Sequence, residues 1–373
     1  MSTQYTRDQA RITVTVNGTE YDGWLQSEVD RGIEAVAGTF SIPISLVPGN
    51  PPPIKRQDQV QVKIGDQVVI TGYVLGAEPF YRRGECGMRI MGRDRTGDLV
   101  RCSAIFKGGQ WLKAGLDRIA KDLVAPFGLQ VVSDTDLGAP IADFKVYHGE
   151  TVVEAISRAA KLRGVLVCPD TKGRLLLTRA GVQKFKGAII RGQNVISMES
   201  IGSDEDRHSQ YIAYAQSSMS LAAENFDTGR SMKATATDAE MLRYLPLIIN
   251  CEGNRSQQEL QTLVDHTARV RRGHSLGFRY QVEGWTFDGE PWPLNQRVPI
   301  YDDVAGLDGD EWLIAAVRHT CDLKEGDVTE LTLRPIEAYD TAPLKSRVHR
   351  ANWGNSGNTT NHSRGPSDHA RGG

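Results

Sequence analysis

The sequence predicts an α+β protein that is mainly β, with two β-rich regions that two similar small β-barrel domains would explain, an inserted α/β domain and helical insertions. Three observations predict this class. Short stretches of alternating apolar and polar residues, separated by Gly-containing turns, fill residues 11–100 and return after residue 190. Two segments with helical periodicity each begin with a capping signal. A strand, Gly-Asp, strand pattern occurs twice, as a duplicated barrel would leave it.

Length and composition limit the classes of protein that fit. The 373 residues suggest two or three domains, and 39% hydrophobic with 24% charged residues indicates a globular chain. A net charge of −2 argues against a dedicated DNA-binding protein, although a local basic patch remains open. No apolar run approaches a membrane span, and the polar N-terminus shows no signal peptide. Five widely spaced cysteines argue against a disulfide framework and for folding in a reducing cytosol.

The first domain is expected to be a small barrel or sandwich. Apolar residues alternate with polar ones over 12–16, and Asn17-Gly18 directly after them is a strong hairpin signal. A second alternating stretch, 39–44, contains Pro43, which lacks a ladder donor and therefore predicts an edge or bulged strand. The stretch 60–70 reads as strand, Gly-Asp turn and strand.

The next segment changes to helical periodicity. Apolar spacing predicts a helix from Trp111 to Val124, which Pro126–Gly128 ends. A second helix opens at Thr151, which forms a capping box with Glu154. Apolar strands on both sides of Asp170–Gly173 predict a hairpin. This segment is therefore expected to be a small α/β domain.

Strands then return, interrupted by one more helix. Residues 211–216 alternate as a strand, and Ser256 with Glu259 makes a second capping box. The helix is expected to end before Gly273. The predicted domains are 1–100 (first barrel), 101–187 (inserted α/β domain), 188–340 (second barrel, with a helical insertion at about 238–272) and 341–373 (flexible polar tail).

A faint internal repeat links the two β-rich regions. Residues 58–62 precede Gly65-Asp66 and a strand, and residues 296–300 precede Gly309-Asp310 and a strand. Two readings are open: β-hairpins often look alike, or a barrel has been duplicated.

Familiar chemical motifs are absent, so no catalytic, cofactor-binding or metal-binding residue is predicted. His266 and His274 are not at zinc-ligand spacing, and there is no Cys-x-x-Cys, nucleotide loop or Gly-x-Ser-x-Gly elbow. Gly108-Gly109 before a predicted helix could hold an anion, but an entry turn needs no ligand. Asp204–Asp206 reads as a solvated loop, and Arg93–Asp98 as a solvated turn with local ion pairs.

The tryptophans are the most informative large side chains. Trp285, Trp292 and Trp312 fall close together, among prolines. Large aromatic residues beside rigid prolines usually belong to a core, and they are also typical anchors of permanent interfaces. These three residues and Asn295 are therefore predicted as interface or core anchors.

Four stretches, set side by side, resemble the baseplate hub protein of Mu-like contractile-tailed phages, the late-control tail protein family. The family has a similar Gly-x-Arg-x-x-x-Asp-Leu-Val-Asp-Cys-Ser-Ala string where this chain has 92–104, and Arg101 departs from its usual Asp. The first 80 residues or so match in strand pattern only. The stretches are 92–104, 149–156 continuing through 173–179, 284–295 and 331–339.

The resemblance implies a structural protein of the virion baseplate, assembled in the bacterial host cytoplasm. It implies a homotrimer around a central channel, in which two barrels per chain give a ring of six. Such a ring would join the sixfold tail tube protein and the threefold central spike protein, and contact other baseplate proteins. DNA would pass through it transiently and without specificity, which favours a neutral or acidic lumen. No membrane insertion, cofactor or enzymatic activity is implied.

Two other functions remain as alternatives. The stretch Tyr147–Ile156 also resembles the opening of a LysM peptidoglycan-binding module, which would make the chain a cell-wall binder. A tail-associated wall hydrolase is the second alternative. It would need a cleft with a perturbed carboxylate, for which the sequence offers no candidate.

Overall fold

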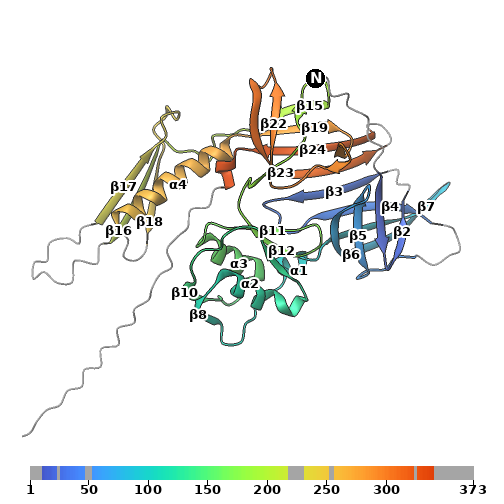
Figure 1. Ribbon diagram of the computed structural model, residues 1–373, viewed down its shortest axis with the longest axis horizontal. Helices are drawn as coiled ribbons and strands as arrows, with labels where there is room; N and C mark the ends of the chain where they lie inside the picture. Colours follow the sequence, from blue (N-terminus) through green and yellow to red (C-terminus); the bar gives the residue numbers. More distant parts are fainter. Residues whose placement is uncertain are drawn as a thin grey trace, which may run out of the picture.

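The computed structural model describes residues 11–22, 26–46, 53–216, 231–251, 256–322 and 326–339. Strands dominate this part of the chain and four α-helices accompany them, which confirms the α+β, mainly β class (Figure 1). The predicted tail, 341–373, lies outside the described residues. None of the described helices is long and apolar enough to cross a membrane.

The first β-module confirms the alternation predicted for the N-terminal region. In β1 every second residue is buried, and Asn17-Gly18 forms its hairpin with β2, both residues at positive φ. Pro43 lies in the part of β4 that no longer pairs with β3. At this position β4 pairs with β7 only, so Pro43 occupies an edge position, as predicted. The strands are β1 (Ile12–Val16), β2 (Thr19–Tyr21), β3 (Ser27–Gly32), β4 (Thr39–Ser45), β5 (Gln59–Ile64), β6 (Gln67–Arg82) and β7 (Glu85–Asp94).

The α/β module follows α1 (Gly97–Arg101) and has its own apolar core. The predicted capping box of Thr151 with Glu154 and the hairpin at Asp170–Gly173 are both confirmed. Its elements are β8 (Gln110–Ala114), α2 (Leu116–Val124), the 3-10 turn η1 (Ala125–Phe127), β9 (Val131–Ser133), β10 (Ile141–Lys145), α3 (Val152–Lys161), β11 (Leu166–Pro169) and β12 (Leu175–Thr178).

The helix predicted from Trp111 to Val124 is wrong in its first part, which is strand β8. Lys113 has a φ of 49°, and this left-handed residue interrupts the alternation of the strand. Trp111 and Ala114 are therefore both buried at a spacing of three, which imitates a helix. Gly108-Gly109 consequently precedes a strand, so the helix-entry anion site considered there is also wrong.

The second β-module carries the other half of the sheet. Its strands curl around a core that contains Trp292, Tyr280 and Phe185. The elements are β13 (Gln183–Lys184), β14 (Ile189–Ile190), β15 (Val195–Ser200), β19 (Phe278–Glu283), β20 (Thr286–Phe287), β21 (Glu290–Pro291), β22 (Gln296–Asp302), β23 (Leu307–Asp322), β24 (Gly326–Arg334) and the 3-10 turn η3 (Ile336–Tyr339).

The two β-modules repeat one strand order. In the first module β5 pairs with β6, β6 with β7 and β7 with β4; in the second β22 pairs with β23, β23 with β24 and β24 with β19. The central strands β6 and β23 each have 16 residues. The predicted repeat therefore corresponds to equivalent hairpins. Gly309, however, lies inside β23 at a register shift, with φ 85°, and the hairpin turn comes earlier at residues 303–306.

One seam joins the two modules into a single 14-stranded sheet. Strand β3 of the first module pairs with β23 of the second from Ser27↔Cys321 to Gly32↔Ala316. Trp285, which follows β19, also crosses the seam and packs in the core of the first module. The modules therefore share backbone hydrogen bonds and apolar contacts.

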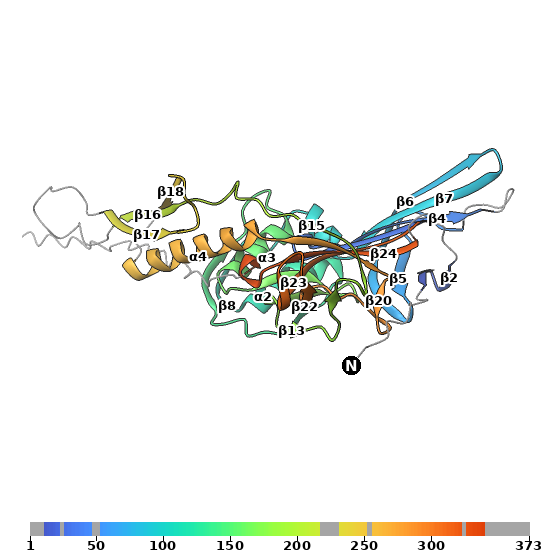
Figure 2. The same cartoon turned by 90° about the horizontal axis from the view of Figure 1, so that it is seen from above.

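A third unit, which we call the wing, comprises β16 (Gln210–Gln216), β17 (Ser231–Thr237), β18 (Pro246–Cys251) and α4 (Gln257–Ser275). It projects from the β-modules (Figures 1 and 2). The helix expected within about 238–272 occupies only the second half of that range, because the first half contains β18. The predicted capping box of Ser256 with Glu259 is confirmed.

Helix α4 does not end before Gly273, as predicted, but continues to Ser275. Glycine is needed here for close packing and not for a helix stop. A Cβ on Gly273 would lie 2.4 Å from the backbone nitrogen of Ala338 in η3. The glycine therefore lets the helix lie directly on the last described turn of the chain.

Candidate functional site

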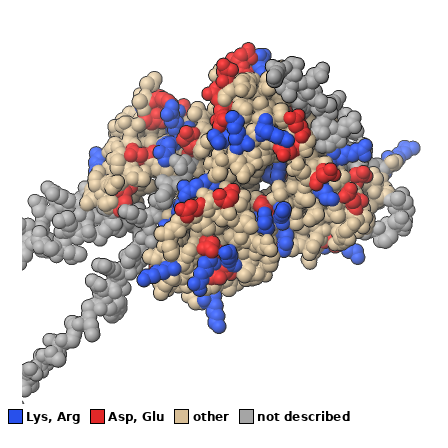
Figure 3. Space-filling model, viewed as in Figure 1, with Lys and Arg blue, Asp and Glu red and all other residues tan. Residues whose placement is uncertain are grey.

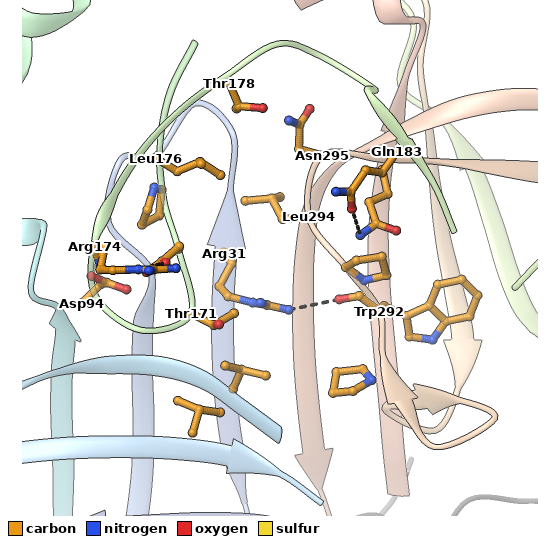
Figure 4. A pocket seen from close by; sticks show the side chains of 18 of the residues that line it. Arg31, Asp94, Thr171, Arg174, Leu176, Thr178, Gln183, Trp292, Leu294 and Asn295 are labelled. Carbon is orange, nitrogen blue, oxygen red and sulfur yellow. Dashed lines mark hydrogen bonds and ion pairs between the residues drawn. The ribbon is translucent and has the colours of Figure 1, made fainter. Parts of the chain in front are cut away.

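Three units meet at one buried junction, shown in Figure 4. Strand β3 contributes Arg31, the end of β7 contributes Asp94, the β11–β12 loop contributes Thr171, and the segment between β21 and β22 contributes Trp292. We call this set, with its immediate neighbours, the junction. It surrounds a pocket of about 380 Å³.

Arg31 is the central cation of the junction and is only 8% exposed. Its Nη2 donates a hydrogen bond of 3.0 Å to the carbonyl oxygen of Trp292, which joins the two β-modules across the pocket. Burial lowers the pKa of Arg31 to about 10, while the charge of Asp94 opposes that shift. The buried guanidinium of Arg31 in the first β-module thus holds the backbone of Trp292 in the second β-module.

Asp94 is the matching buried acid. Its carboxylate accepts a hydrogen bond of 3.0 Å from the backbone N–H of Thr96, whose hydroxyl donates to the carbonyl of Val36 at 2.6 Å. Burial raises the pKa of Asp94 to about 7, even though the Thr96 hydrogen bonds and Arg31 oppose the shift. The reading of Arg93–Asp98 as a solvated turn is therefore wrong, because Asp94 and Thr96 are buried.

The α/β module is tied to the same place by short polar contacts. Thr71 on β6 donates its hydroxyl hydrogen to the carbonyl of Thr171 at 2.9 Å. Arg95 extends the contact by donating to the carbonyl of Gly128 at 3.3 Å. Gly173 has a φ of 72°, and a Cβ there would lie 2.9 Å from the Thr71 carbonyl oxygen. This loop therefore requires a glycine to approach the first module.

The side chains of the junction support backbone segments from three units. Its paired side chains satisfy one another: Arg174 bonds to Asp170, and Gln296 to Gln183. Among the described residues, no group of three or more His, Cys, Asp or Glu side chains could hold a metal ion. What this geometry does is fix three units against one another.

A buried histidine completes the seam beside Arg31. His319 Nδ1 lies 3.0 Å from the hydroxyl of Thr329, which donates its hydrogen to the carbonyl of Gly284 at 2.7 Å. Because that hydroxyl hydrogen is already used, we assign the ring hydrogen to Nδ1. Burial, and secondarily the charge of Arg31, lowers the pKa of His319 well below its ordinary value. The seam therefore contains a neutral imidazole.

The three predicted tryptophan anchors occupy different places. Trp292 is buried in the second-module core against Phe185, with ring centroids 5.3 Å apart. Trp312 is half-buried on the same core, with its ring edge to Phe278 at 4.9 Å. Trp285 lies in the first-module core, and its indole N–H donates to the carbonyl of Thr320 at 2.9 Å. All three act here as contacts within the chain, and their role at interfaces stays a prediction.

Asn295, the fourth predicted anchor, closes the edge of the pocket. It adopts a φ of 60° and uses both ends of its amide. Its Oδ1 accepts from the backbone N–H of Gly181 at 3.1 Å, and its Nδ2 donates to the carbonyl of Arg179 at 2.9 Å. Asparagine tolerates this backbone conformation and supplies both a donor and an acceptor, so it holds the segment after β12 against the second module.

A second charged cluster holds the base of the wing. Arg207 is 5% exposed and donates to both carboxylate oxygens of Asp238 at 3.0 Å, with further bonds to Asp204 and Glu240. Arg272 at the end of α4 also bonds to Glu240. The cluster therefore links the segment before β16, the end of β17 and the end of α4. No local sequence pattern marks Arg207, because its main partner, Asp238, is 31 residues away.

Replacing Asp204, Glu205 and Asp206 together with alanine should leave assembly intact. The three side chains are exposed, as predicted, and only Asp204 bonds to Arg207, which keeps Asp238 and Glu240. We expect a loss of about 1 kcal/mol or less in stability, as is typical of exposed ion pairs. Light scattering and urea unfolding of the triple variant measure both effects; a change in oligomeric mass would contradict the expectation.

Asp94→Asn should remove one component of the pH dependence of stability. The folded-state pKa of Asp94, about 7, lies above its ordinary value, so the folded chain retains a proton that the unfolded chain releases. Ionisation of Asp94 therefore lowers stability as pH rises from about 4 to about 7. Asn cannot ionise and still accepts from Thr96. The melting temperature of the wild type should fall more than that of Asp94→Asn between pH 5 and pH 8; parallel curves would count against a raised pKa.

Two protein-family models match consecutive parts of this chain, and both describe phage baseplate proteins. A model described as "Mu phage baseplate assembly protein GpP-like, N-terminal" matches residues 11–94. A model described as "Baseplate hub protein gp44-like, second domain" matches residues 96–179. The two matches meet at the turn that contains Asp94 and Thr96, where the first β-module joins the α/β module.

Relatives of similar length support the same family. The baseplate hub protein gp44 of Escherichia phage Mu is 31% identical over 346 residues, which is 90% of each chain. The crystal structure of the 43 kDa tail protein of prophage MuSo2 from Shewanella oneidensis has a TM-score of 0.78 and 32% identity, covering 88% of this chain and 100% of that one. A tail protein of Neisseria meningitidis MC58 has the same fold, with a TM-score of 0.74, 21% identity and 91% and 99% coverage.

Proposed function

Because this chain belongs to the family of baseplate hub proteins of Mu-like phages, we propose that three copies close into a ring around an axial channel. The chain is a structural hub component of the phage tail, and it associates with other tail and baseplate proteins. We further propose that the ring joins the tail tube protein to the central spike protein, and that it assembles in the host cytoplasm. On this proposal, the genome passes through the channel during ejection.

The repeat of one strand order in the two β-modules carries this proposal. Two equivalent modules in each of three chains give six similar units in a ring. A sixfold tube could then contact six similar surfaces, while a threefold spike contacts three identical chains. The continuous seam from β3 to β23 supports the proposal because it fixes the two modules of one chain at a constant relative orientation.

The charge of the chain is compatible with a channel for DNA. With a net charge of −2 per chain, a ring of three carries a small negative charge. A lumen that attracted phosphates strongly would slow the passage of DNA, because each phosphate contact adds to affinity. We therefore propose a lumen without a continuous basic surface.

Light scattering of the purified full chain tests the ring. The expected mass is three times the 41.1 kDa of one chain, and a single-chain mass at every concentration would contradict it.

We propose a non-enzymatic role, so a zymogram on cell walls should show no clearing and a peptidoglycan pull-down should retain no protein. Clearing or retention would instead favour the wall hydrolase or the LysM-like binder.

A further inference from the structure

The wing has one covered and one uncovered sheet face. Helix α4 packs on the face formed by Tyr211, Ala213 and Ala215, and these side chains are buried. The positions between them on β16, and their neighbours on β17 and β18, face the other way. In Figure 2 no described element covers that side of the sheet. We call it the outward face; it is formed by Ile212, Tyr214, Lys233 and Ile248 on the strands, and we include with it the exposed residues Arg243 and Tyr244 of the adjoining loop before β18.

The outward face is rich in apolar and aromatic side chains that contact solvent. Ile248 is 58% exposed and Tyr244 is 82% exposed. Leu242, in the same loop as Tyr244, is also exposed. Grouped exposed apolar residues rimmed by polar ones mark contact surfaces, and Tyr and Arg are enriched where such contacts are strongest.

The charged side chains of the outward face are both cations, and the acid in the same loop, Glu240, is paired with Arg207 and Arg272. Lys233 and Arg243 are exposed, and neither forms an ion pair with any residue in the described part of the chain. Lys233 lies above the ring of Tyr214, with Nζ 5.9 Å from the centroid. No Asp or Glu occupies an outward position on the described residues of the three strands. The complement of this face is therefore an apolar surface with carboxylates.

The same chain carries such a surface at the β22–β23 turn. Asp303, Asp308 and Asp310 are exposed there, together with the apolar side chains of Tyr301 and Val304. We call these five residues the acidic turn. Figure 3 shows acidic side chains gathered over the ends of β22 and β23.

Ion pairs within the described part of the chain neutralise only part of the negative charge of the acidic turn. Arg191 pairs with Asp303 at 2.7 Å. Asp308 and Asp310 form no ion pair with a described cation, although the Asp310 carboxylate accepts from the backbone of Asp308 at 3.0 Å. Two carboxylates thus correspond to the two cations of the outward face.

We propose that the outward face of the wing in one subunit packs on the acidic turn of the neighbouring subunit. This inference rests on the ring proposed above and identifies the contact that closes it. Within one chain the wing and the acidic turn lie apart in both ribbon views, so their contact requires a second copy (Figures 1 and 2). Two different surfaces of one chain make a head-to-tail contact, which closes into a ring when the rotation between copies allows it.

Charge reversal tests the contact. Lys233→Glu with Arg243→Glu should raise the dissociation constant of the ring by about tenfold or more, because like charges then face one another. Adding Asp308→Lys and Asp310→Lys should restore most of the affinity. The matched control is Lys107→Glu with Lys161→Glu, two exposed cations of the α/β module outside the junction and both surfaces, which should change nothing. Analytical ultracentrifugation measures the dissociation constant of the ring for the wild type, the double variant, the quadruple variant and the control, each as the full chain.

A cysteine pair gives an independent readout. Ile248→Cys with Val304→Cys, both at exposed positions, should form covalent trimers under mild oxidation. Each single-cysteine variant should form no covalent trimer. The single variants therefore control for cross-links made by the five native cysteines. If the wild type is trimeric but neither the rescue nor the cross-link occurs, this contact is overturned and the ring stands. If the wild type is always a monomer, the ring and the contact are both overturned.

Discussion

Trp292→Ala should destabilise the chain by about 3–5 kcal/mol, the usual cost of deleting a buried large aromatic side chain. Trp292 is 1% exposed and packs on Phe185 and Phe287, with ring centroids 5.3 and 5.9 Å apart. Its removal would leave a void beside the carbonyl that accepts from Arg31. We therefore expect impaired folding or impaired formation of the trimer, measured by urea unfolding and light scattering.

Trp292→Phe is the matched control for that variant. The indole N–H of Trp292 has no hydrogen-bond partner among the described residues, so phenylalanine loses volume but no polar contact. We expect about half the cost of the alanine variant or less, because most of the aromatic contact remains. A soluble Trp292→Ala protein that is fully trimeric and as stable as the wild type would refute the role of this side chain.

Arg207→Ala should have a comparable effect, confined to the wing. Burial alone would lower the pKa of Arg207, but the hydrogen bonds that it donates to Glu240, Asp238 and Asp204 raise that pKa above the ordinary value. Removing the guanidinium leaves Asp238 buried without its cation, which costs about 3–5 kcal/mol for a buried pair. The wing should then open locally more often than the two β-modules.

Amide hydrogen exchange on the Arg207→Ala protein would detect that change. Protection should fall in β16, β17 and β18 and stay unchanged in β6 and β23. The alanine triple variant at residues 204–206, which keeps Arg207 and Asp238, is the control that should resemble the wild type. Unchanged protection in the wing of Arg207→Ala would show that this cluster does not hold it.

Features set by neighbouring residues could be predicted from the sequence. The alternation over Ile12–Val16, the Asn17-Gly18 hairpin and the two capping boxes depend on contacts a few residues apart, and the structure confirms each. The exceptions have local causes of their own. Lys113 adopts a positive φ that gives a strand helical spacing, and Gly273 serves a close packing contact instead of a helix end.

The junction could not be predicted, because its partners are remote in sequence. Arg31 and Trp292 are 261 positions apart, and nothing near Arg31 indicates that it is buried. Asp94 stands in a string of charges that resembles a solvated turn, and the segments packed around this turn, such as the one that contains Val36, are remote in sequence. The tryptophans and Asn295 could be singled out by type, but the core to which each belongs depends on the seam between the modules.

The most direct test of the ring is electron microscopy of the purified full chain, with averaged views along the particle axis. We expect an annulus with threefold symmetry, an open axial hole and six similar density lobes around it, two from each chain. A solid particle that contains one copy of the chain and has no axial hole would contradict it.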